Sequence, residues 1–539
     1  MKKIKSEQIE KKLEHFFPEK KAYQEVILFF IILLGLFVRV YKINGLDVGG
    51  AWDEGYSMIA ASNLIEDKKL LFINHMPNKD GILIDKPPGL YVFGAAFIKP
   101  FGNHEISARA VSILFGVLSI YAFFLLVNYI TKETGLAILS ACIFAFFPLH
   151  VALSRAFIGH VPALFFSITS IYLLIKGVGE KKLKLLFIAG LLVSINLFIL
   201  LWFGILPVIG VMIWMFLYIY RDKDLRKYYF YSLLCVFVGL LIFMTWPLLL
   251  SLNEDKYYGF HGDCVLPNCD VWDMLFKHNM VNRTGMNKLD IMHTLSTPYS
   301  TYVDIIQRLS RPYLGQGHFS FSREFDSYYK IFLYFGIFLS LMRLNLRCMR
   351  KISLFWLFWL MPYLPIQFGE NLYTQYLMLV VPFFCFYTAY GIYGLDAIQL
   401  KLFQNKLLLT GITILICCLF FLKAIAMIKY DREYLYKTNY KLMGEYLRNK
   451  TAPSKVICSR YPGMSYYLKG ECKPWDAVNE DLGKYIKENE IKYVDIRRAE
   501  LKQFEPILQR VGCKKINKLI GISDDAEHSL FRCGEHLNQ

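Results

Sequence analysis

Charged side chains are scarce in this sequence, and several common sequence features are missing from it. Asp, Glu, Lys and Arg make up 19% of its 539 residues, whereas 55% are hydrophobic. There is no repeat at a fixed period, no low-complexity tract and no cysteine and histidine spacing typical of a zinc finger. The hydrophobic share far exceeds what one soluble core requires, so we expect lipid to solvate much of the chain.

Long apolar runs recur along the chain at lengths that approach the hydrocarbon thickness of a bilayer. They predict an α-helical polytopic membrane protein with about eleven transmembrane helices. A shorter apolar stretch at residues 89–98 predicts a helix lying at the membrane interface. The predicted spans are residues 26–38, 113–130, 136–149, 161–175, 185–201, 203–220, 233–250, 331–341, 354–366, 376–395 and 407–428.

The formal net charge of +17 is concentrated between alternate spans. This distribution predicts membrane topology rather than nucleic-acid binding. By the positive-inside rule, the basic segments 2–21, 176–184, 221–227 and 343–351 face the cytoplasm. No small-residue cleavage site follows the first apolar run, so we expect a retained signal anchor in a multi-pass protein of the cell membrane.

This topology predicts three parts. They are a cytoplasmic basic N-terminus at 1–23, a transmembrane domain at 24–428 with outer loops 43–105 and 253–328, and a small exoplasmic α/β domain at 429–539. The last part is predicted from strand-like stretches at 455–459, 492–496 and 518–522 that alternate with helix-like stretches at 481–489 and 500–511.

Six cysteines lie outside the predicted spans, in groups of even number. Cys264 and Cys269 share the second outer loop, and the tail contains Cys458, Cys472, Cys513 and Cys533. Even groups in an oxidising compartment predict disulfides, although the spacing leaves their connectivity open.

An acidic pair and a proline turn stand out in the first outer loop. Asp53 and Glu54 lie in the sequence Ala-Trp-Asp-Glu-Gly-Tyr. Two adjacent carboxylates favour a catalytic role, yet acidic residues are also common in the first turn of an ordinary helix. In Asp85-Lys86-Pro87-Pro88 the prolines fix the backbone, so they either hold Lys86 toward a substrate or form a rigid turn whose lysine meets lipid phosphates.

The order of these motifs resembles the first membrane module of the GT-C glycosyltransferases, in the branch related to protein O-mannosyltransferases and aminoarabinose lipid A transferases. The resemblance is specific over residues 39–162, faint over 375–382 and absent from the second outer loop and the tail. The motifs that carry it are Arg39-Val40-Tyr41, Trp52-Asp53-Glu54-Gly55-Tyr56, Asp85-Lys86-Pro87-Pro88-Gly89-Leu90-Tyr91, Phe101-Gly102, Ser107-Ala108-Arg109, Pro148-Leu149-His150 and Ser154-Arg155-Ala156.

The resemblance implies roles for several of these side chains. Asp53 is expected to be the catalytic base, with Glu54 as its neighbour or substitute, because an acceptor hydroxyl must lose its proton as it attacks. A polyprenyl-phosphate leaving group requires a cation, for which Lys86 is the first candidate and Arg155 the second. Arg109 is expected either to close a helix end or to pair with Asp85.

Four further residues keep alternative interpretations. His160 stands where relatives usually carry an acidic residue, and it is expected to contact phosphate, ligate a metal or pack at a helix entrance. His261 is either a ligand of a divalent cation or part of a disulfide-tied loop. Gln375 and Tyr376 lie at the outer mouth of a late span, where they either line a lipid-phosphate groove or simply occupy the interface. No cofactor is certain, and a divalent cation stays open.

The resemblance therefore implies an inverting glycosyltransferase that moves a sugar from a polyprenyl-phosphate donor to a hydroxyl or phosphate acceptor on a lipid, glycan or protein. The alternatives are a membrane transporter or lipid flippase, and a non-catalytic scaffold. Transport is less favoured, because the polar motifs lie in outer loops and few charged residues lie near the middle of the spans.

Overall fold

The computed structural model describes most of the first half of the chain and most of the tail. The described residues are 21–45, 48, 52–66, 82–83, 87–219, 222–251, 257–258, 336–338, 353–355, 378–379, 381–393, 406–430, 440–458, 461–469, 472–474, 482–517 and 528–533.

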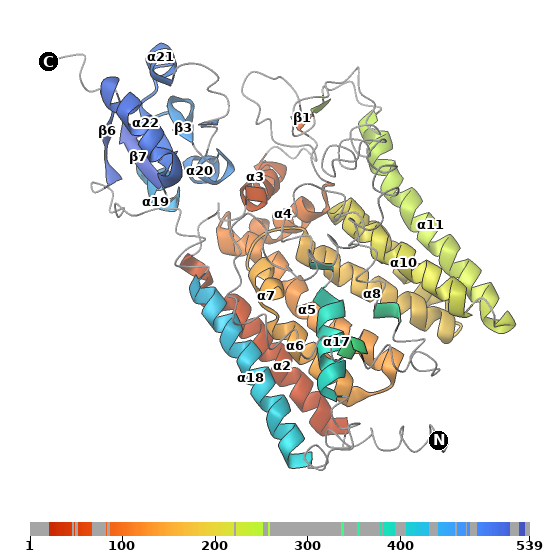
Figure 1. Cartoon of the computed structure of the whole chain (residues 1–539). Helices are drawn as coiled ribbons and strands as arrows, with labels where there is room; N and C mark the ends of the chain where they lie inside the picture. Colours follow the sequence, from red (N-terminus) through yellow and green to blue (C-terminus); the bar gives the residue numbers. More distant parts are fainter. Residues whose placement is uncertain are drawn as a thin grey trace, which may run out of the picture.

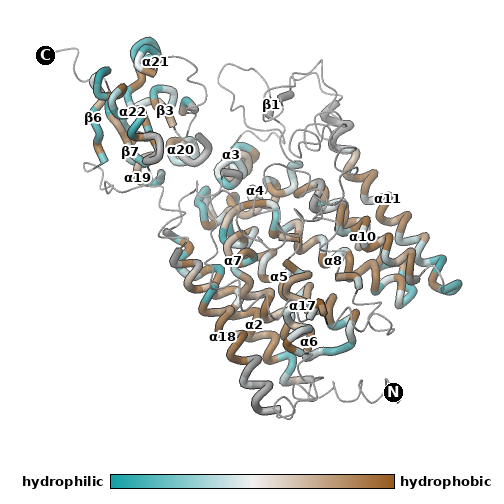
Figure 2. Tube along the Cα trace, in the orientation of Figure 1, coloured by the Kyte–Doolittle hydropathy of each residue, from teal (hydrophilic) through white to brown (hydrophobic). Residues whose placement is uncertain are grey.

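Apolar helices packed side by side form a bundle (Figure 1), which appears as a brown block of hydrophobic residues in Figure 2. Helices that are apolar around their whole circumference need lipid or other helices on every side. In chain order the helices of the bundle are α2 (Lys21–Val40), α5 (Glu105–Thr131), α6 (Thr134–Phe146), α7 (Pro148–Ser154), α8 (His160–Gly179), α9 (Leu183–Ile199), α10 (Leu201–Ile219), α11 (Lys223–Ser251), α17 (Val381–Tyr393) and α18 (Lys406–Tyr430).

These helices confirm a mostly helical membrane fold. Four of the described helices are long and apolar enough to cross a membrane, or five when α6 and α7, bent by 56°, count as one span. The bend falls where Phe147 is extended and Pro148 starts α7, because proline cannot continue the hydrogen bonding of α6. The predicted spans at 331–341 and 354–366 lie almost wholly outside the described residues, so the count of eleven stays a prediction.

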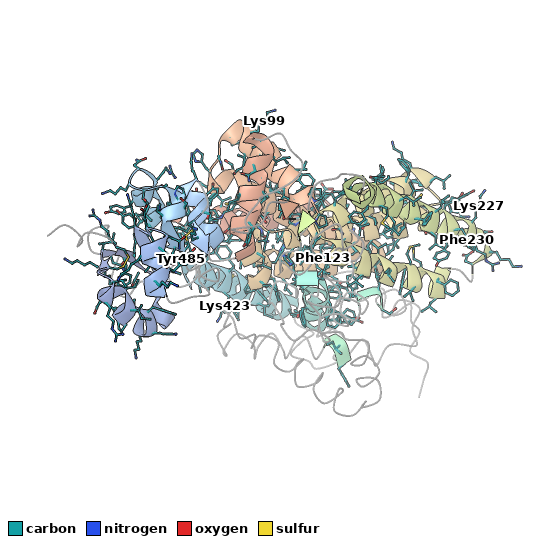
Figure 3. All side chains as sticks on the ribbon, turned by 90° about the horizontal axis from the view of Figure 1, so that it is seen from above. Lys99, Phe123, Lys227, Phe230, Lys423 and Tyr485 are labelled. Carbon is teal, nitrogen blue, oxygen red and sulfur yellow. A yellow bond between two sulfur atoms is a disulfide. The ribbon has the colours of Figure 1, made fainter. Side chains whose placement is uncertain are left out.

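Burial across the bundle distinguishes core positions from lipid-facing ones. Viewed from above, Phe123 of α5 lies near the centre, whereas Phe230 of α11 lies at the edge (Figure 3). Phe123 is fully buried and Phe230 is 53% exposed. An aromatic side chain left this open on an apolar helix is expected to face lipid.

Two glycines bring α9 and α11 into backbone contact. A methyl group on Gly190 would lie 2.2 Å from the carbonyl oxygen of Cys235, and one on Gly239 would lie 2.3 Å from the carbonyl oxygen of Gly190. Small residues allow this close approach, which is a main source of helix association in membranes. Asn196 of α9 also donates a hydrogen bond of 2.8 Å to Ser167 of α8.

Short elements gather at one end of the bundle, where η1 (Ile43–Gly45), α3 (Trp52–Glu66) and α4 (Gly89–Phe101) follow α2 (Figure 1). The predicted interfacial stretch forms α4. Strand β1 (Ile82–Leu83) pairs in parallel with β2 (Tyr257–Tyr258). This pairing joins the two loops that the topology predicts on the same side of the membrane.

The tail forms a five-stranded sheet covered by helices, at the same end of the bundle as α3 (Figure 1). The strand order is β4-β3-β5-β7-β6, in which β3 is parallel to β4 and β5, and β7 is antiparallel to β5 and β6. The elements are α19 (Tyr440–Arg448), η6 (Pro453–Lys455), β3 (Val456–Cys458), α20 (Tyr461–Leu468), β4 (Lys473–Pro474), α21 (Leu482–Glu488), β5 (Tyr493–Arg497), α22 (Arg498–Arg510), β6 (Lys514–Lys515) and β7 (His528–Arg532).

Two of the strands and both helices predicted in the tail match β3, β5, α21 and α22. The strand predicted at 518–522 lies outside the described residues, and β7 was not predicted. Disulfides join Cys458 to Cys472 and Cys513 to Cys533, which confirms pairing in the tail and supplies its connectivity. Cys264 and Cys269 lie outside the described residues.

Candidate active site

Glu54 and Arg109 form a buried ion pair between α3 and α5. Arg109 Nε lies 2.7 Å from Glu54 Oε1, and its NH2 lies 3.0 Å from Oε2. The backbone N–H of Phe157 donates to the same Oε1 at 2.8 Å. Both side chains are at most 1% exposed, and a bidentate pair with an added hydrogen bond is the arrangement that a buried carboxylate needs. Glu54 thereby fixes the first turn of α3.

The ion pair gives one of the two acidic residues of the motif, Glu54, a structural role. Both oxygens of Glu54 accept hydrogen bonds from Arg109 or Phe157, so this carboxylate is committed to holding three segments together. Asp53 precedes it in the first turn of α3. The structure pairs Arg109 with Glu54, which was not predicted. The predicted partner, Asp85, lies outside the described residues.

A small cavity lies one helical turn along α3 from Asp53. It is lined by Ser57 of α3, by Pro87 and by His160, among others. Pro87 directly follows Lys86 in the chain. The cavity is therefore lined by His160 itself and by residues close in sequence to Asp53 and Lys86. His160 is the first residue of α8 and is 3% exposed, a place that is consistent both with packing at a helix entrance and with contact to a ligand in the cavity.

The helix α4 approaches α3 closely beside this cavity. A methyl group on Gly94 would lie 2.4 Å from the ring of Phe157 and 2.9 Å from the side chain of Ala61. The residue that donates to Glu54 therefore also packs against α4. This contact holds the segment that follows the Lys86 turn against the helix that carries Asp53.

Arg155 binds the C-terminal end of α2. Its NH1 donates to the carbonyl oxygens of Val38, Arg39 and Tyr41 at 3.1, 3.0 and 2.8 Å. The last carbonyls of a helix carry partial negative charge, which a buried cation stabilises. The structure thus gives Arg155 a capping contact; direct binding of phosphate by this residue stays a prediction.

Arg39 and His150 form a buried network for which the sequence analysis assigned no role. Arg39 NH1 donates to the carbonyls of Gly35 and Ala145 at 2.7 and 3.0 Å, and its NH2 lies 2.9 Å from His150 Nδ1. His150 Nδ1 also lies 3.1 Å from the carbonyl oxygen of Phe144, and its Nε2 lies 3.1 Å from Ser119 Oγ, so both ring nitrogens have buried polar partners. Both residues lie in the recognised motifs, and a charged residue inside an apolar run was the available signal.

Several predicted residues lie outside the described part of the chain. They are Asp85, Lys86, His261, Gln375 and Tyr376, and Asp53 is described by its place in α3. Within the described ranges no group of three or more His, Cys, Asp or Glu side chains lies close enough to hold a metal ion.

Comparisons with known proteins show which families and folds this chain resembles. Residues 85–248 match the family model of dolichyl-phosphate-mannose-protein mannosyltransferases. A stretch of 274 residues is 25% identical to a Bacillus subtilis (strain 168) protein named "Putative mannosyltransferase YkcB", covering 50% of this chain and 36% of that relative. The match thus spans little more than a third of the relative's length.

Two solved structures share the fold over nearly the whole chain. ArnT from Cupriavidus metallidurans, bound to undecaprenyl phosphate, is 12% identical with a TM-score of 0.62, over 95% of this chain and 98% of ArnT. The Archaeoglobus fulgidus oligosaccharyltransferase in its apo form is 12% identical with a TM-score of 0.63, over 91% of this chain and 71% of that enzyme.

The chain has the fold of the GT-C membrane glycosyltransferases, so the resemblance carried by its motifs is confirmed. The family model and the Bacillus subtilis protein are named as mannosyltransferases, and the two proteins of similar fold are ArnT and an oligosaccharyltransferase. The transporter or flippase alternative is not favoured by these matches.

Proposed function

We propose that the protein is an inverting glycosyltransferase that transfers a sugar from a polyprenyl-phosphate donor to a hydroxyl or phosphate group of an acceptor. The family model supports the transferase activity, and it spans residues 85–248, from Asp85 into helix α11. A neighbour of the same fold is described with undecaprenyl phosphate bound, which supports a lipid-linked donor for this chain.

In this mechanism Asp53 removes the proton from the acceptor hydroxyl. The acceptor oxygen then forms the bond to the anomeric carbon, and the bond from that carbon to the phosphate oxygen breaks with its electron pair. The leaving group is the polyprenyl phosphate, whose developing charge Lys86 stabilises. A single displacement at carbon inverts its configuration.

The observation that carries the proposal is the division of roles in the acidic motif. Glu54 is held by Arg109 and Phe157, and this fixes the helix turn that carries Asp53. The cavity lined by Ser57 and His160 begins one helical turn further along α3, and Asp53 is proposed to act there because a general base needs a defined position. His160 contacts the donor phosphate in this scheme, and Arg155 adds buried positive charge through its contact with the end of α2.

We also propose that the site faces away from the cytoplasm. The turns that contain Lys132 and residues 180–182 connect helices at the end of the bundle opposite α3, and lysines mark cytoplasmic turns. The two disulfides of the tail support an oxidising compartment for the other end. The N-terminus is then cytoplasmic and the tail is outside.

The test is transfer by purified full-length protein in lipid nanodiscs, with polyprenyl-phosphate-mannose as the first donor and an extract of cell-surface glycans and lipids as acceptor. The substitution Asp53→Asn should reduce transfer by about 10²- to 10⁴-fold, the range of general-base catalysis, and leave donor binding intact. Asp224→Asn is the matched control, since Asp224 is 82% exposed at the start of α11. Full activity of Asp53→Asn would remove Asp53 from the mechanism.

A further inference from the structure

A second cavity lies between the membrane bundle and the tail sheet, and we call it the seam cavity. Its volume is about 520 Å³, which is in the range of sites for small molecules. Helix α3 contributes one wall, the turn before α5 a second, and the helices α19 and α20 of the tail the others. The residues used below are Ser62, Asn63, Asn103, Glu105, Glu445 and Tyr466.

The walls of the seam cavity are joined across the two parts of the protein. Asn103 Oδ1 accepts hydrogen bonds from Ser62 Oγ at 3.1 Å and from Tyr466 OH at 3.3 Å. Lys441 Nζ lies 3.2 Å from Glu105 Oε1, and the backbone N–H of Val48 donates to Tyr467 OH at 2.9 Å. Both α19 and α20 are therefore tied to the end of the bundle that carries α3.

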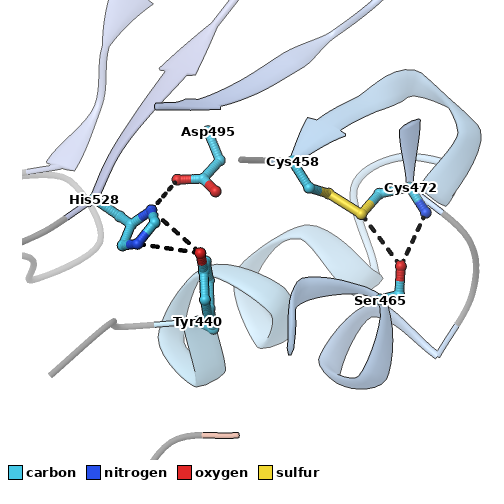
Figure 4. Close-up of a disulfide and its surroundings, with 6 residues drawn as sticks. All are labelled: Tyr440, Cys458, Ser465, Cys472, Asp495 and His528. Atoms are coloured by element: carbon cyan, nitrogen blue, oxygen red, sulfur yellow. Dashed lines mark hydrogen bonds and ion pairs between the residues drawn. A yellow bond between two sulfur atoms is a disulfide. The ribbon is translucent and has the colours of Figure 1, made fainter. Parts of the chain in front are cut away.

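Hydrogen bonds within the tail hold the helices that line the cavity, α19 and α20, in place (Figure 4). Tyr440, which starts α19, lies 3.1 Å from His528 Nε2, and His528 Nδ1 lies 3.1 Å from Asp495 Oδ1. The ring of His528 therefore links the hydroxyl of Tyr440 to the carboxylate of Asp495. Ser465 of α20 hydrogen-bonds to Cys472 of the adjacent disulfide. The helices that line the cavity are thus anchored to the sheet.

The chemistry of the lining selects among ligand classes. The lining carries charges of both signs, with carboxylates on Glu105 and Glu445 and cations on Lys441, Arg448 and Lys469, and Lys441 is already paired with Glu105. Neither sign therefore covers the cavity. An acyl chain needs an apolar surface, such as the groove between α9, α10 and α11 around Met212 and Phe237.

A neutral polyhydroxyl ligand fits the seam cavity better. Sugar hydroxyls both donate and accept hydrogen bonds, and the lining offers amides on Asn63 and Asn103, the hydroxyl of Ser62 and the carboxylate of Glu445. Tyr466 adds an aromatic ring, which contributes apolar contact area beside its polar hydroxyl.

The position of the seam cavity relates it to the proposed reaction. Ser62 follows Asp53 by nine residues in α3, which corresponds to about 14 Å along a helix that rises 1.5 Å per residue. This separation exceeds the length of one sugar ring. A ligand in the seam cavity is therefore not the group that reacts at Asp53, but a remote part of a longer molecule.

We infer that the seam cavity binds a carbohydrate portion of the acceptor, remote from the hydroxyl that receives the transferred sugar. The acceptor is then an oligosaccharide or a glycolipid headgroup rather than a peptide. This inference rests on the proposed function. Binding energy from such a remote part of a substrate positions the reacting group.

The experiment separates acceptor binding from the chemistry of the donor. Full-length protein in lipid nanodiscs receives polyprenyl-phosphate-mannose, and the acceptor is a glycan and glycolipid extract from cells that lack the protein. The variants are Asn63→Ala and Glu445→Ala, which alter the cavity lining. Glu488→Ala in α21 is the matched control, because this glutamate is exposed on a helix of the tail away from the cavity.

We expect each cavity variant to raise the half-saturating concentration of the extract by about tenfold, equal to 1.4 kcal/mol, with unchanged maximal rate and unchanged acceptor-free hydrolysis of the donor. The control should match the unaltered protein. An unchanged half-saturating concentration in both cavity variants overturns the inference, as does equal transfer to tryptic peptides of surface proteins. If the unaltered protein neither transfers nor hydrolyses the donor, the proposed function fails instead.

Discussion

Buried polar groups are held in different ways in the bundle and in the tail. At the upper end of the bundle, Arg39 and Arg155 donate to backbone carbonyls, and Arg109 pairs with Glu54. In the tail, the ring of His528 lies within hydrogen-bonding distance of Asp495 and Tyr440. Two disulfides cross-link this part of the protein. The bundle thus buries three arginines, two of which contact backbone carbonyls, while the tail buries a carboxylate beside a histidine.

The difference follows from size and surroundings. The separate core of the tail contains a small cluster of apolar residues around Val494 and Phe531, and small domains in oxidising compartments commonly need cross-links. The bundle has a far larger apolar core, and its buried arginines are stabilised there by backbone carbonyls and by the carboxylate of Glu54. Buried ionisable residues in a membrane protein mark functional regions by default.

Breaking the buried ion pair of the bundle should have the largest effect on stability. The substitution Arg109→Met leaves the carboxylate of Glu54 buried without its cation, and we expect a loss of about 3–5 kcal/mol in the free energy of unfolding. Denaturant unfolding of the detergent-solubilised protein measures it. Adding Glu54→Gln should restore part of the loss, because no charge then stays buried.

The matched control for this prediction is the exposed pair between Lys441 and Glu105. Lys441 is 46% exposed, so Lys441→Met should cost less than about 1 kcal/mol. Equal losses of unfolding free energy in Arg109→Met and Lys441→Met would contradict the prediction that the buried ion pair contributes more than the exposed one.

Removing a disulfide should have the next largest effect, confined to the tail. The double substitution Cys513→Ser and Cys533→Ser opens a loop closed over a sequence separation of 20, and a loss of about 3 kcal/mol is expected from the chain entropy. Limited proteolysis of the tail and donor hydrolysis measure the two regions separately. Cys418→Ser, at an exposed free cysteine of α18, is the control. Lost donor hydrolysis in the double variant would show that the two regions are not independent.

The smallest expected effect concerns the donor. Lys86→Ala should raise the KM for polyprenyl-phosphate sugar by about tenfold, equal to 1.4 kcal/mol, because a cation that meets the phosphate is lost. Lys99→Ala is the control, since Lys99 is exposed near the end of α4 and lies at the rim in Figure 3. Unchanged turnover and donor affinity in Lys86→Ala would contradict the proposal that Lys86 contacts the donor phosphate.

The sequence predicted the helices and the class of enzyme better than it predicted the partners of individual residues. Hydropathy identified α5 and α8 because a span is a local property of the chain. The partner of Arg109 was not predicted, because Glu54 lies 55 positions away and only the packing of α3 on α5 brings them together. The strand β7 was missed for a similar reason, since it depends on pairing with β5.

The order of motifs, the apolar runs and the cysteine groups were by themselves enough to predict a membrane protein with the GT-C fold and a cross-linked tail. These features depend only on the local composition of the chain and on the spacing of its residues. Only the tertiary structure decided that Glu54 pairs with Arg109 and fixes the first turn of α3, and that helices of the tail line a polar cavity beside α3. Such assignments depend on contacts between residues far apart in sequence, which form only when the helices pack.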